Sequence, residues 1–389
     1  MKKVLLGGTA LAAAALVGAM PASAADANVT SGLQMKISGF IASQAALVLS
    51  DSRSDNGGFD RDYDFQTNAR LIFDLKNVTD SGLEYGGRIR LNSVNRRDGI
   101  RVTRTYVYVK GAFGTITFGN APTVADDIGY IYAHDELAGD IGAGGGDFGD
   151  LLDGDFPLGG GQFYSIDATY LAGLTNEDTR IKYVSPSING FSFGVDFTPV
   201  VGGASHAGPG GVNDLINDDS TLYENVVTGG INWQGDFSGV NVLVAGTAAY
   251  GNGVTSNNNP QNHDLEVYTL GGRVKSGGIA ASVNWTHNSS IYLTDKAIDT
   301  VIGDLSYTWG PFLASVSYAY TWSDKNNGLV QPDTGGTDLR DNHVAGVNLT
   351  YTVAPGLNTY AEVIYEKQNF RFGKDFEAAN LLTGINLAF

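Results

Sequence analysis

The chain of 389 residues contains no cysteine, and this absence excludes several classes of protein. Without thiols there is no disulfide scaffold, no thiolate zinc or iron–sulfur site and no cysteine nucleophile. Basic residues are also scarce, with 24 Lys and Arg against 41 Asp and Glu and a formal net charge of −17. We therefore expect no nucleic-acid partner, because neutralising phosphates requires a basic surface.

Long hydrophobic runs are missing everywhere except at the N-terminus. Lys2 and Lys3 precede an apolar run over residues 4–20, and the Pro-Ala-Ser-Ala stretch at 21–24 provides a small-x-small cleavage site. This pattern predicts a cleaved secretory signal peptide over residues 1–24, which leaves residues 25–389 as the mature chain. No later stretch approaches the roughly 18 apolar residues of a spanning helix, so a membrane-resident product must span the bilayer with strands.

Apolar and polar residues alternate with a period of two through the mature chain. Over 312–323, for example, Val316 and Tyr318 share one parity while Ser315 and Ser317 share the other. Because successive side chains of a strand point to opposite faces, such a segment has one apolar and one polar face. We predict about sixteen strands, over residues 33–49, 63–76, 82–95, 100–110, 114–119, 178–185, 190–198, 221–234, 238–251, 263–276, 278–288, 295–309, 311–323, 339–353, 356–369 and 375–389.

The connections between these segments alternate between tight turns and long polar loops. This alternation places all turns on one rim and all loops on the other, as in outer-membrane barrels. The predicted fold is therefore all-β: a single transmembrane antiparallel β-barrel over residues 25–389, wide enough to enclose an aqueous channel. The longest connection, residues 120–178, calls for a function or for disorder, and it would narrow the lumen if it folded inward.

Charge is distributed unevenly around the predicted lumen. No Lys or Arg occurs between Lys110 and Arg180, where the loop is acidic. We predict an acidic side of the constriction formed by Asp126, Asp127, Asp135, Glu136, Asp140, Asp147, Asp150, Asp153 and Asp155. In the first strands, the alternate positions that form the polar face include four arginines on adjacent strands. We therefore predict a basic wall opposite the acidic side, formed by Arg70, Arg88, Arg90 and Arg101. The alternative is that the loop acids are solvated and the arginines pair with neighbouring acids.

One further arginine is assigned differently. In a regular strand Arg104 would point to the same, apolar face as Val102, Tyr106 and Tyr108, because these residues are separated by even numbers of positions. We interpret it as marking a bulge or a subunit contact and leave it out of the predicted pore set.

Catalysis and cofactors find little support in the sequence. None of the usual hydrolase, metalloprotease or nucleotide-binding motifs is present, and the histidines lack ligand spacing, so we expect no enzyme activity. Asp150, Asp153 and Asp155 are weak calcium candidates, because carboxylates are hard oxygen ligands, but they lack EF-hand spacing. We therefore favour solvated loop carboxylates and expect no cofactor.

Two hairpins and the chain end resemble those of the Gram-negative general diffusion porins. Residues 180–193 are similar to the Arg-x-x-Tyr-x-Ser-Pro-x-x-x-Gly-Phe hairpin that follows the inward loop of that family, and residues 108–119 resemble the hairpin before it. Phe389 looks like the terminal aromatic that the barrel-assembly machinery recognises. Thr103 stands where that family often has a pore arginine.

The resemblance implies a homotrimer of 16-stranded barrels in a Gram-negative outer membrane, in contact with lipid and lipopolysaccharide. It also implies that the third loop, residues 120–178, folds into the lumen of each barrel as a constriction loop. Such a protein passes small hydrophilic solutes without catalysis. Since acids outnumber bases, we expect a weak preference for cations. The alternatives are a substrate-specific outer-membrane channel and a secreted soluble β-sandwich or adhesin, which would be extractable without detergent.

Overall fold

The computed structural model describes residues 32–51, 63–94, 100–129, 131, 178–201, 223–254, 263–289, 296–327, 330–331 and 335–389. In these ranges nearly all residues belong to one antiparallel sheet of 17 strands, in which β14 has only 2 residues. The strands are β1 (Gln34–Asp51), β2 (Tyr63–Val78), β3 (Glu84–Val94), β4 (Ile100–Gly111), β5 (Gly114–Asn120), β6 (Thr179–Val184), β7 (Phe191–Val201), β8 (Tyr223–Phe237), β9 (Val240–Gly253), β10 (Leu265–Ser276), β11 (Ile279–Asn288), β12 (Ile298–Trp309), β13 (Phe312–Ser323), β14 (Val330–Gln331), β15 (Gly336–Ala354), β16 (Leu357–Phe372) and β17 (Phe376–Ala388). Apart from β14, each matches one of the predicted strands.

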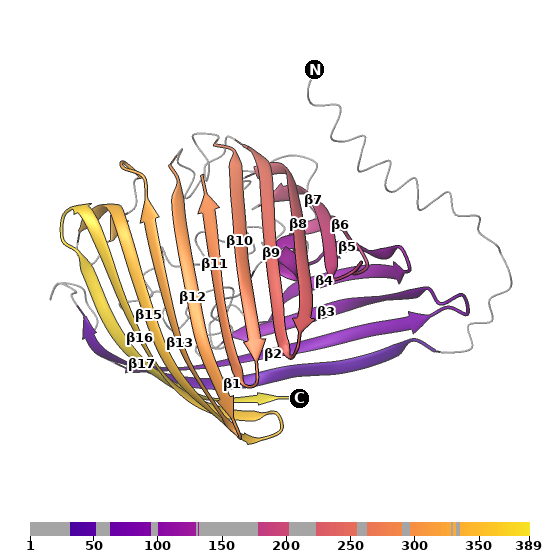
Figure 1. Ribbon diagram of the computed structural model, residues 1–389, viewed down its shortest axis with the longest axis horizontal. Helices are drawn as coiled ribbons and strands as arrows, with labels where there is room; N and C mark the ends of the chain where they lie inside the picture. Colours follow the sequence, from indigo (N-terminus) through magenta and orange to yellow (C-terminus); the bar gives the residue numbers. More distant parts are fainter. Residues whose placement is uncertain are drawn as a thin grey trace.

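The sheet closes on itself, because β1 pairs with β2 on one side and with β17 on the other. Figure 1 shows β8 to β13 standing side by side while β1, β2 and β3 run across the picture. At the seam, Phe389 N donates to Gly39 O and Gly39 N donates to Phe389 O, both at 3.0 Å. Closure removes the unpaired edges of an open sheet. The predicted all-β antiparallel barrel is thus confirmed.

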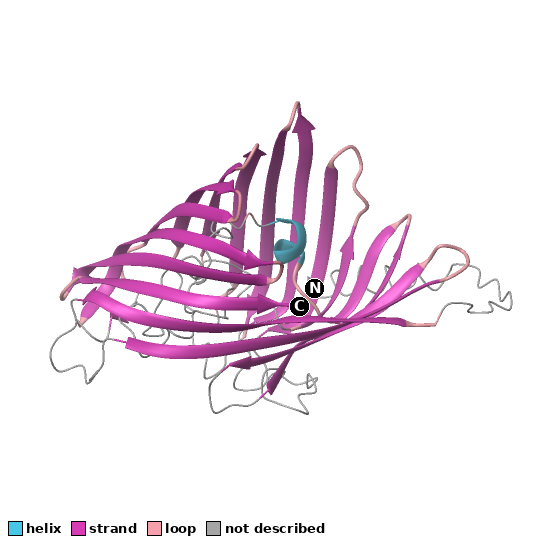
Figure 2. Ribbon diagram, turned by 90° about the horizontal axis from the view of Figure 1, so that it is seen from below, coloured by secondary structure: helices cyan, strands magenta, loops and turns pink. Residues whose placement is uncertain are grey.

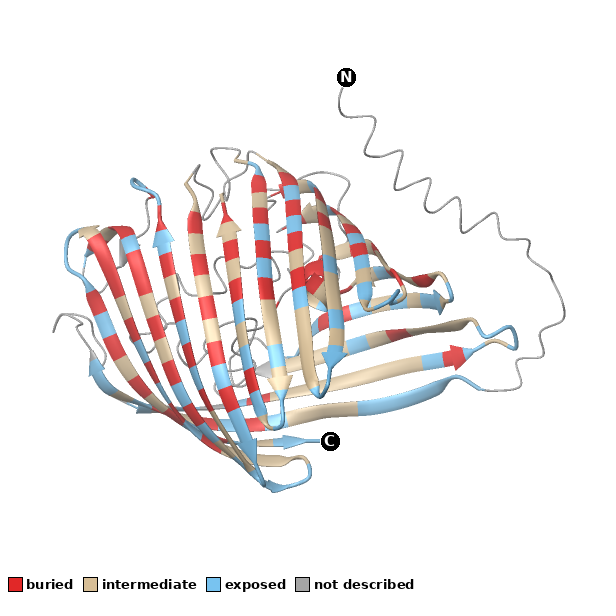
Figure 3. Ribbon diagram, in the orientation of Figure 1, coloured by how far each residue is buried: buried red, intermediate tan, exposed pale blue. Residues whose placement is uncertain are grey.

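The two faces of the barrel wall differ in polarity, as the alternation predicts. On β13, Val316 and Tyr318 are about half exposed, whereas Ser315 and Ser317 are buried. Figure 3 shows the same alternation of buried and exposed bands along the neighbouring strands. Large apolar side chains exposed in this way cover the outer face, and the polar residues of opposite parity line the inner face.

A β-bulge in β4 reverses the parity of that strand. Arg90 pairs with Arg104, but the next residue of β3, Leu91, pairs with Val102, so Thr103 is an extra residue. A one-residue shift moves side chains to the other face of a sheet. The interpretation of Arg104 as marking a bulge is thus confirmed. Because Arg104 shares the inner face with Arg90, its exclusion from the pore set is corrected.

The rims follow the predicted division into short and long connections, with one departure. Ser238 and Gly239, both at positive φ, link β8 to β9. On the opposite rim the connections are longer, except that residues 373–375 alone join β16 to β17. The short helical segment η1 (Ala125–Gly129) lies among the strands in Figure 2. In the described part of the chain, no helix has the length and apolar character needed to cross a membrane.

Candidate functional site: a charged inner wall

Basic side chains line the inner face of β2 and β3, at the positions that parity predicts. Arg88 pairs in register with Asp74 of β2, and Arg70 pairs with Asn92 of β3. Arg90 lies on the same face as Arg88 because side chains two residues apart in a strand share a face. The structure thus brings Arg70, Arg88 and Arg90 together on adjacent strands.

Each of these arginines has a defined polar or aromatic neighbour. Arg88 forms a two-point ion pair with Asp74, with Nε–Oδ1 at 2.6 Å and Nη2–Oδ2 at 3.0 Å. Arg70 Nε donates to Asn92 Oδ1 at 2.9 Å, and its guanidinium carbon lies 5.2 Å from the centre of the Phe40 ring. Pairing with a neighbouring acid, the alternative left open by the sequence, thus holds for Arg88.

The other two arginines of the predicted wall complete this patch on its β4 side. Arg90 Nε donates to Oγ1 of the bulged Thr103 at 2.7 Å. Arg101 pairs through its backbone with Asn92, but its side chain lies outside the described part of the structure.

Three more cations lie on the inner face and extend the wall across β4 and β6: Arg104, Arg180 and Lys182. Arg180 pairs in register with Gly119, and Lys182 with Thr117, both on the inner face of β5. The sequence contained the signal for Arg180 and Lys182. They alternate with Ile181 and Tyr183, which places the two basic side chains on the polar, inner face of the strand. For Arg104 the signal was that apolar residues occupy an even position at Val102 but an odd position at Val107, which indicates an extra residue between them.

The start of the long connection after β5 lies against this inner wall. Val124 N donates to Asp196 Oδ2 of β7 at 2.6 Å. Farther along, the Asn232 side chain of β8 donates to Ile128 O at 2.8 Å. Gly230 leaves room for this segment, because a Cβ at this position would come within 2.7 Å of Val124 Cγ1 and one of the two would have to shift. These contacts run from strand to strand across the inner face, so residues 121–129 follow the wall.

Lys182 and Arg104 hold the same segment through its acids. Lys182 Nζ donates to Asp127 Oδ2 and, at 2.8 Å, to Pro122 O. Arg104 Nη2 lies 3.8 Å from Asp126 Oδ2. Although 36% of the Asp127 side chain is exposed, desolvation by the surrounding barrel raises its pKa, and Lys182 opposes this rise.

Arg180 and Asp196 form a buried pair behind this segment. Arg180 Nη1 lies 3.8 Å from Asp196 Oδ1, and both side chains are 0% exposed. Arg180 Nε also donates to Asp178 O at 3.2 Å. Together with Arg88–Asp74, Arg104–Asp126 and Lys182–Asp127, this pair gives four cations of the inner wall a nearby carboxylate.

Of the predicted acidic side, only Asp126 and Asp127 are placed, and they contact basic residues of the wall. The remaining predicted acids lie outside the described residues: Asp135, Glu136, Asp140, Asp147, Asp150, Asp153 and Asp155. The course of residues 132–177 and the signal peptide over residues 1–24 lie outside them too and stay predictions. Within the residues that the structure describes, no group of 3 or more His, Cys, Asp or Glu could hold a metal ion.

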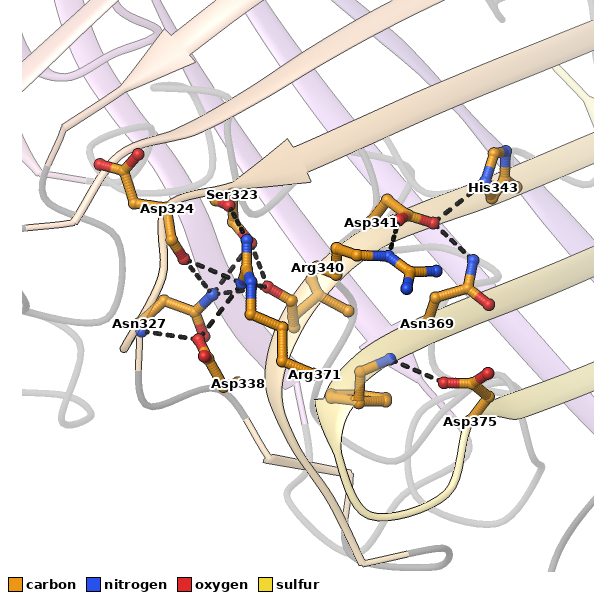
Figure 4. A network of polar contacts seen from close by, with 12 residues as sticks. Ser323, Asp324, Asn327, Asp338, Arg340, Asp341, His343, Asn369, Arg371 and Asp375 are labelled. Carbon is orange, nitrogen blue, oxygen red and sulfur yellow. Dashed lines mark hydrogen bonds and ion pairs between the residues drawn. The ribbon is translucent and has the colours of Figure 1, made fainter.

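A polar network lies at the rim of long loops, where β13 and β16 end and β15 begins (Figure 4). Arg371 Nη2 donates to Ser323 O at 2.6 Å, and Arg371 Nη1 lies 3.3 Å from Asp338 Oδ1. Asp338 Oδ1 also accepts from Asn327 N at 3.1 Å. Arg371 of β16 thus ties the end of β13 to the start of β15.

A closed sheet with an apolar outer face and a charged inner face defines a transmembrane β-barrel with an aqueous lumen. Residues 9–370 match the family model described as Gram-negative porin. The chain belongs to this family and is an outer-membrane channel.

Solved structures show the same fold at low sequence identity. OmpF of Salmonella typhi in complex with daunomycin is 14% identical, with a TM-score of 0.61, covering 92% of this chain and 98% of that one. The anion-selective porin from Comamonas acidovorans is 14% identical, with a TM-score of 0.59 and coverages of 92% and 100%. The in-vitro folded trimer form of OmpT, an outer membrane protein of Vibrio cholerae, has the same values. No curated protein matches the chain in sequence.

Proposed function

We propose that this chain is a passive, weakly cation-preferring channel for small hydrophilic solutes. The observation that carries the proposal is the pairing of inner-wall cations with carboxylates: Arg88 with Asp74, Arg104 with Asp126, Lys182 with Asp127 and Arg180 with Asp196. Pairing reduces the positive field that these side chains project into the lumen. The acid excess of the whole chain, with a net charge of −17, then governs the ions that enter.

The inner wall also supports passage without a tight, dedicated binding site for one solute. Several of its described polar side chains bond to one another, as in Thr247–Thr269 at 2.6 Å and Thr300–Thr321 at 2.8 Å. Side chains that satisfy each other offer few free groups to a passing solute, so transit is fast and weakly selective. Substrate-specific uptake is the alternative that the same measurements distinguish.

Assembly as a homotrimer is part of the proposal. It is supported by the trimer form in which OmpT of Vibrio cholerae was solved and by the likeness of residues 180–193 to the porin hairpin. Phe389, with 57% of its surface exposed at the seam, is accessible to an assembly factor. The exposed apolar outer face suits contact with lipid and, on the outer leaflet, lipopolysaccharide.

The test is ion conduction by purified, refolded protein in planar lipid bilayers. The proposal expects stepwise conductance and a reversal potential across a KCl gradient that favours K⁺. Preference for Cl⁻ would defeat the charge argument, and saturable conduction by one solute only would favour the substrate-specific alternative. Cross-linking in detergent checks the trimer, since a monomer alone would contradict that part.

A further inference from the structure

Three lysines lie on the inner face of β1 to β4, close to the rim of short turns. Lys36 is near the start of β1, Lys76 near the end of β2 and Lys110 near the end of β4. Lys36 follows the exposed, outward-facing Met35, and Lys110 follows the exposed, outward-facing Val109. Because neighbouring residues of a strand point to opposite faces, these lysines point into the lumen. We call Lys36, Lys76 and Lys110 the turn-side lysines.

The first carboxylate near these lysines is already engaged by an arginine. Asp74 pairs in register with Lys36 on one side and with Arg88 on the other. Both of its oxygens accept hydrogen bonds from Arg88, at 2.6 and 3.0 Å. One negative charge thus lies between two positive charges, and Lys36 adds to the positive field of the wall.

The second carboxylate is shared in the same way. Glu84 Oε2 lies 2.6 Å from Lys76 Nζ, and Glu84 Oε1 accepts a hydrogen bond from the Tyr108 hydroxyl at 3.1 Å. Lys110 pairs with Glu84 in register and places a second cation beside it. On the inner face near the turns, four cations therefore surround two carboxylates. The excess stays positive even when Asp80, in the adjoining turn, is counted.

The turn-side lysines are open to solvent and close enough to act together. Lys36 and Lys110 are exposed, and 50% of the Lys76 side chain is exposed. Neighbouring strands lie roughly 5 Å apart, so β1 and β4 are separated by about 15 Å. The Debye length is about 10 Å at 0.1 M salt, so an ion in this mouth interacts with the lysines as a group.

Toward the loop rim the same wall changes character. Inner-face residues there are neutral on β1 and β2, as Gln44, Ala46 and Asn68 show. The connection after β5 contains no Lys or Arg between Lys110 and Arg180, so its charged side chains are all acidic. The positive excess of this wall is therefore displaced toward the turn rim.

We propose that Lys36, Lys76 and Lys110 make the turn-side mouth of the lumen attract small multivalent anions, such as tricarboxylates. This inference rests on the proposed channel function and deepens it, because one mouth then has the opposite preference to that of the whole pore. Rings of basic side chains act in this way in anion-conducting pores, since charged walls concentrate counter-ions. An anion from the loop side must cross the length of the lumen before it reaches these lysines.

The experiment measures block of K⁺ current by citrate, added to one side at a time, through single refolded full-length channels in about 0.1 M KCl. We expect half-block from the turn side at an about threefold lower citrate concentration than from the loop side. Ser238→Cys provides the orientation, because Ser238 lies in the turn between β8 and β9 and the chain has no cysteine. Streptavidin that binds a biotin on this thiol changes the current only from the chamber that the turns face.

The variant that combines Lys36→Gln, Lys76→Gln and Lys110→Gln should abolish the difference between the two sides, because it removes the positive excess. In the unaltered protein the difference should also disappear at about 1 M KCl, where the Debye length is about 3 Å. The replaced side chains are exposed, and exposed ion pairs contribute little to stability, so we expect the variant to assemble.

The matched control combines Lys325→Gln, Lys367→Gln and Lys374→Gln, which removes the same charge near the loop rim. It should keep the difference between the two sides. Equal block from both sides, stronger block from the loop side, or an unchanged difference in the turn-side variant would overturn the inference while the channel function stands. If that variant does not assemble, Lys36→Gln alone should still reduce the difference. Absence of any current in the unaltered protein would instead overturn the proposed function.

Discussion

Arg88 and Asp74 face each other across β3 and β2, with 2.6 Å between Arg88 Nε and Asp74 Oδ1. Their side chains stay 38% and 31% exposed. Partly exposed ion pairs contribute little to stability, because water and salt screen them. The main consequence of this pair is therefore electrostatic: the carboxylate cancels a positive charge on the inner wall.

Replacing Asp74 by Asn removes that cancellation and leaves the Arg88 charge on the wall. We expect the permeability ratio of K⁺ to Cl⁻ to fall by roughly a factor of two, since a single lumen charge acts through screened water. Reversal potentials of the variant and of Glu377→Gln, which alters an outward-facing acid, provide the comparison. If the reversal potential shifted by the same amount in both variants, Asp74 would not lie closer to the ion path than an outward-facing acid.

Replacing Arg70 by Ser removes a cation that contacts Phe40 and Asn92 on the inner face. The loss of volume should raise the single-channel conductance, and the loss of charge should increase the preference for cations. Arg340→Ser is the control, because Arg340 lies on the rim with 56% of its side chain exposed. Unchanged conductance and reversal potential in Arg70→Ser would place Arg70 away from the narrowest part.

Replacing Arg180 by Met tests the buried pair with Asp196. The variant leaves a carboxylate at 0% exposure without its cation, and such losses cost about 3–5 kcal/mol. We expect a lower midpoint in thermal unfolding, measured by heat-modifiable electrophoretic mobility. Lys367→Met removes a cation from an exposed pair and should change stability by less than about 1 kcal/mol. Equal midpoints for the two variants would contradict the assigned role of Arg180.

Deleting Phe389 tests the seam of the barrel. The deletion removes both 3.0 Å hydrogen bonds that Phe389 makes with Gly39, so we expect a lower yield of assembled barrels. Barrels that do assemble should conduct normally, because Phe389 lies at the end of the wall. Phe389→Ala keeps the backbone pair and removes only the ring, so a normal yield in this variant would assign the defect to hydrogen bonding. A normal yield from the deletion itself would contradict the role at the seam.

The strands could be predicted because alternation reports directly on the two faces of a sheet. Arg70, Arg88 and Arg90 follow from that parity alone. For Arg104 the sequence indicated the bulge but not the face, because one extra residue, Thr103, moves the following residues of β4 to the opposite face. Apolar residues change from even positions at Val102 to odd positions at Val107, which is the trace of the bulge in the sequence.

The path of the connection after β5 could not be predicted in the same way. It has no periodicity, and its position depends on partners distant in sequence, such as Asp196 for Val124 N, 72 residues away. The space that admits Val124 comes from Gly230 on β8, and sequence spacing does not reveal which glycine a side chain approaches. Register and close packing, rather than local pattern, determine this part of the lumen.

The most direct test of the central claim is the reversal potential of the unaltered protein in a planar bilayer across a KCl gradient. A channel in which Arg88, Arg104, Arg180 and Lys182 of the inner wall lie beside carboxylates, in a chain with a net charge of −17, should be weakly selective for K⁺. The preference should weaken as ionic strength rises, because salt screens the wall charges. A reversal potential of the opposite sign, reporting preference for Cl⁻, would contradict this account.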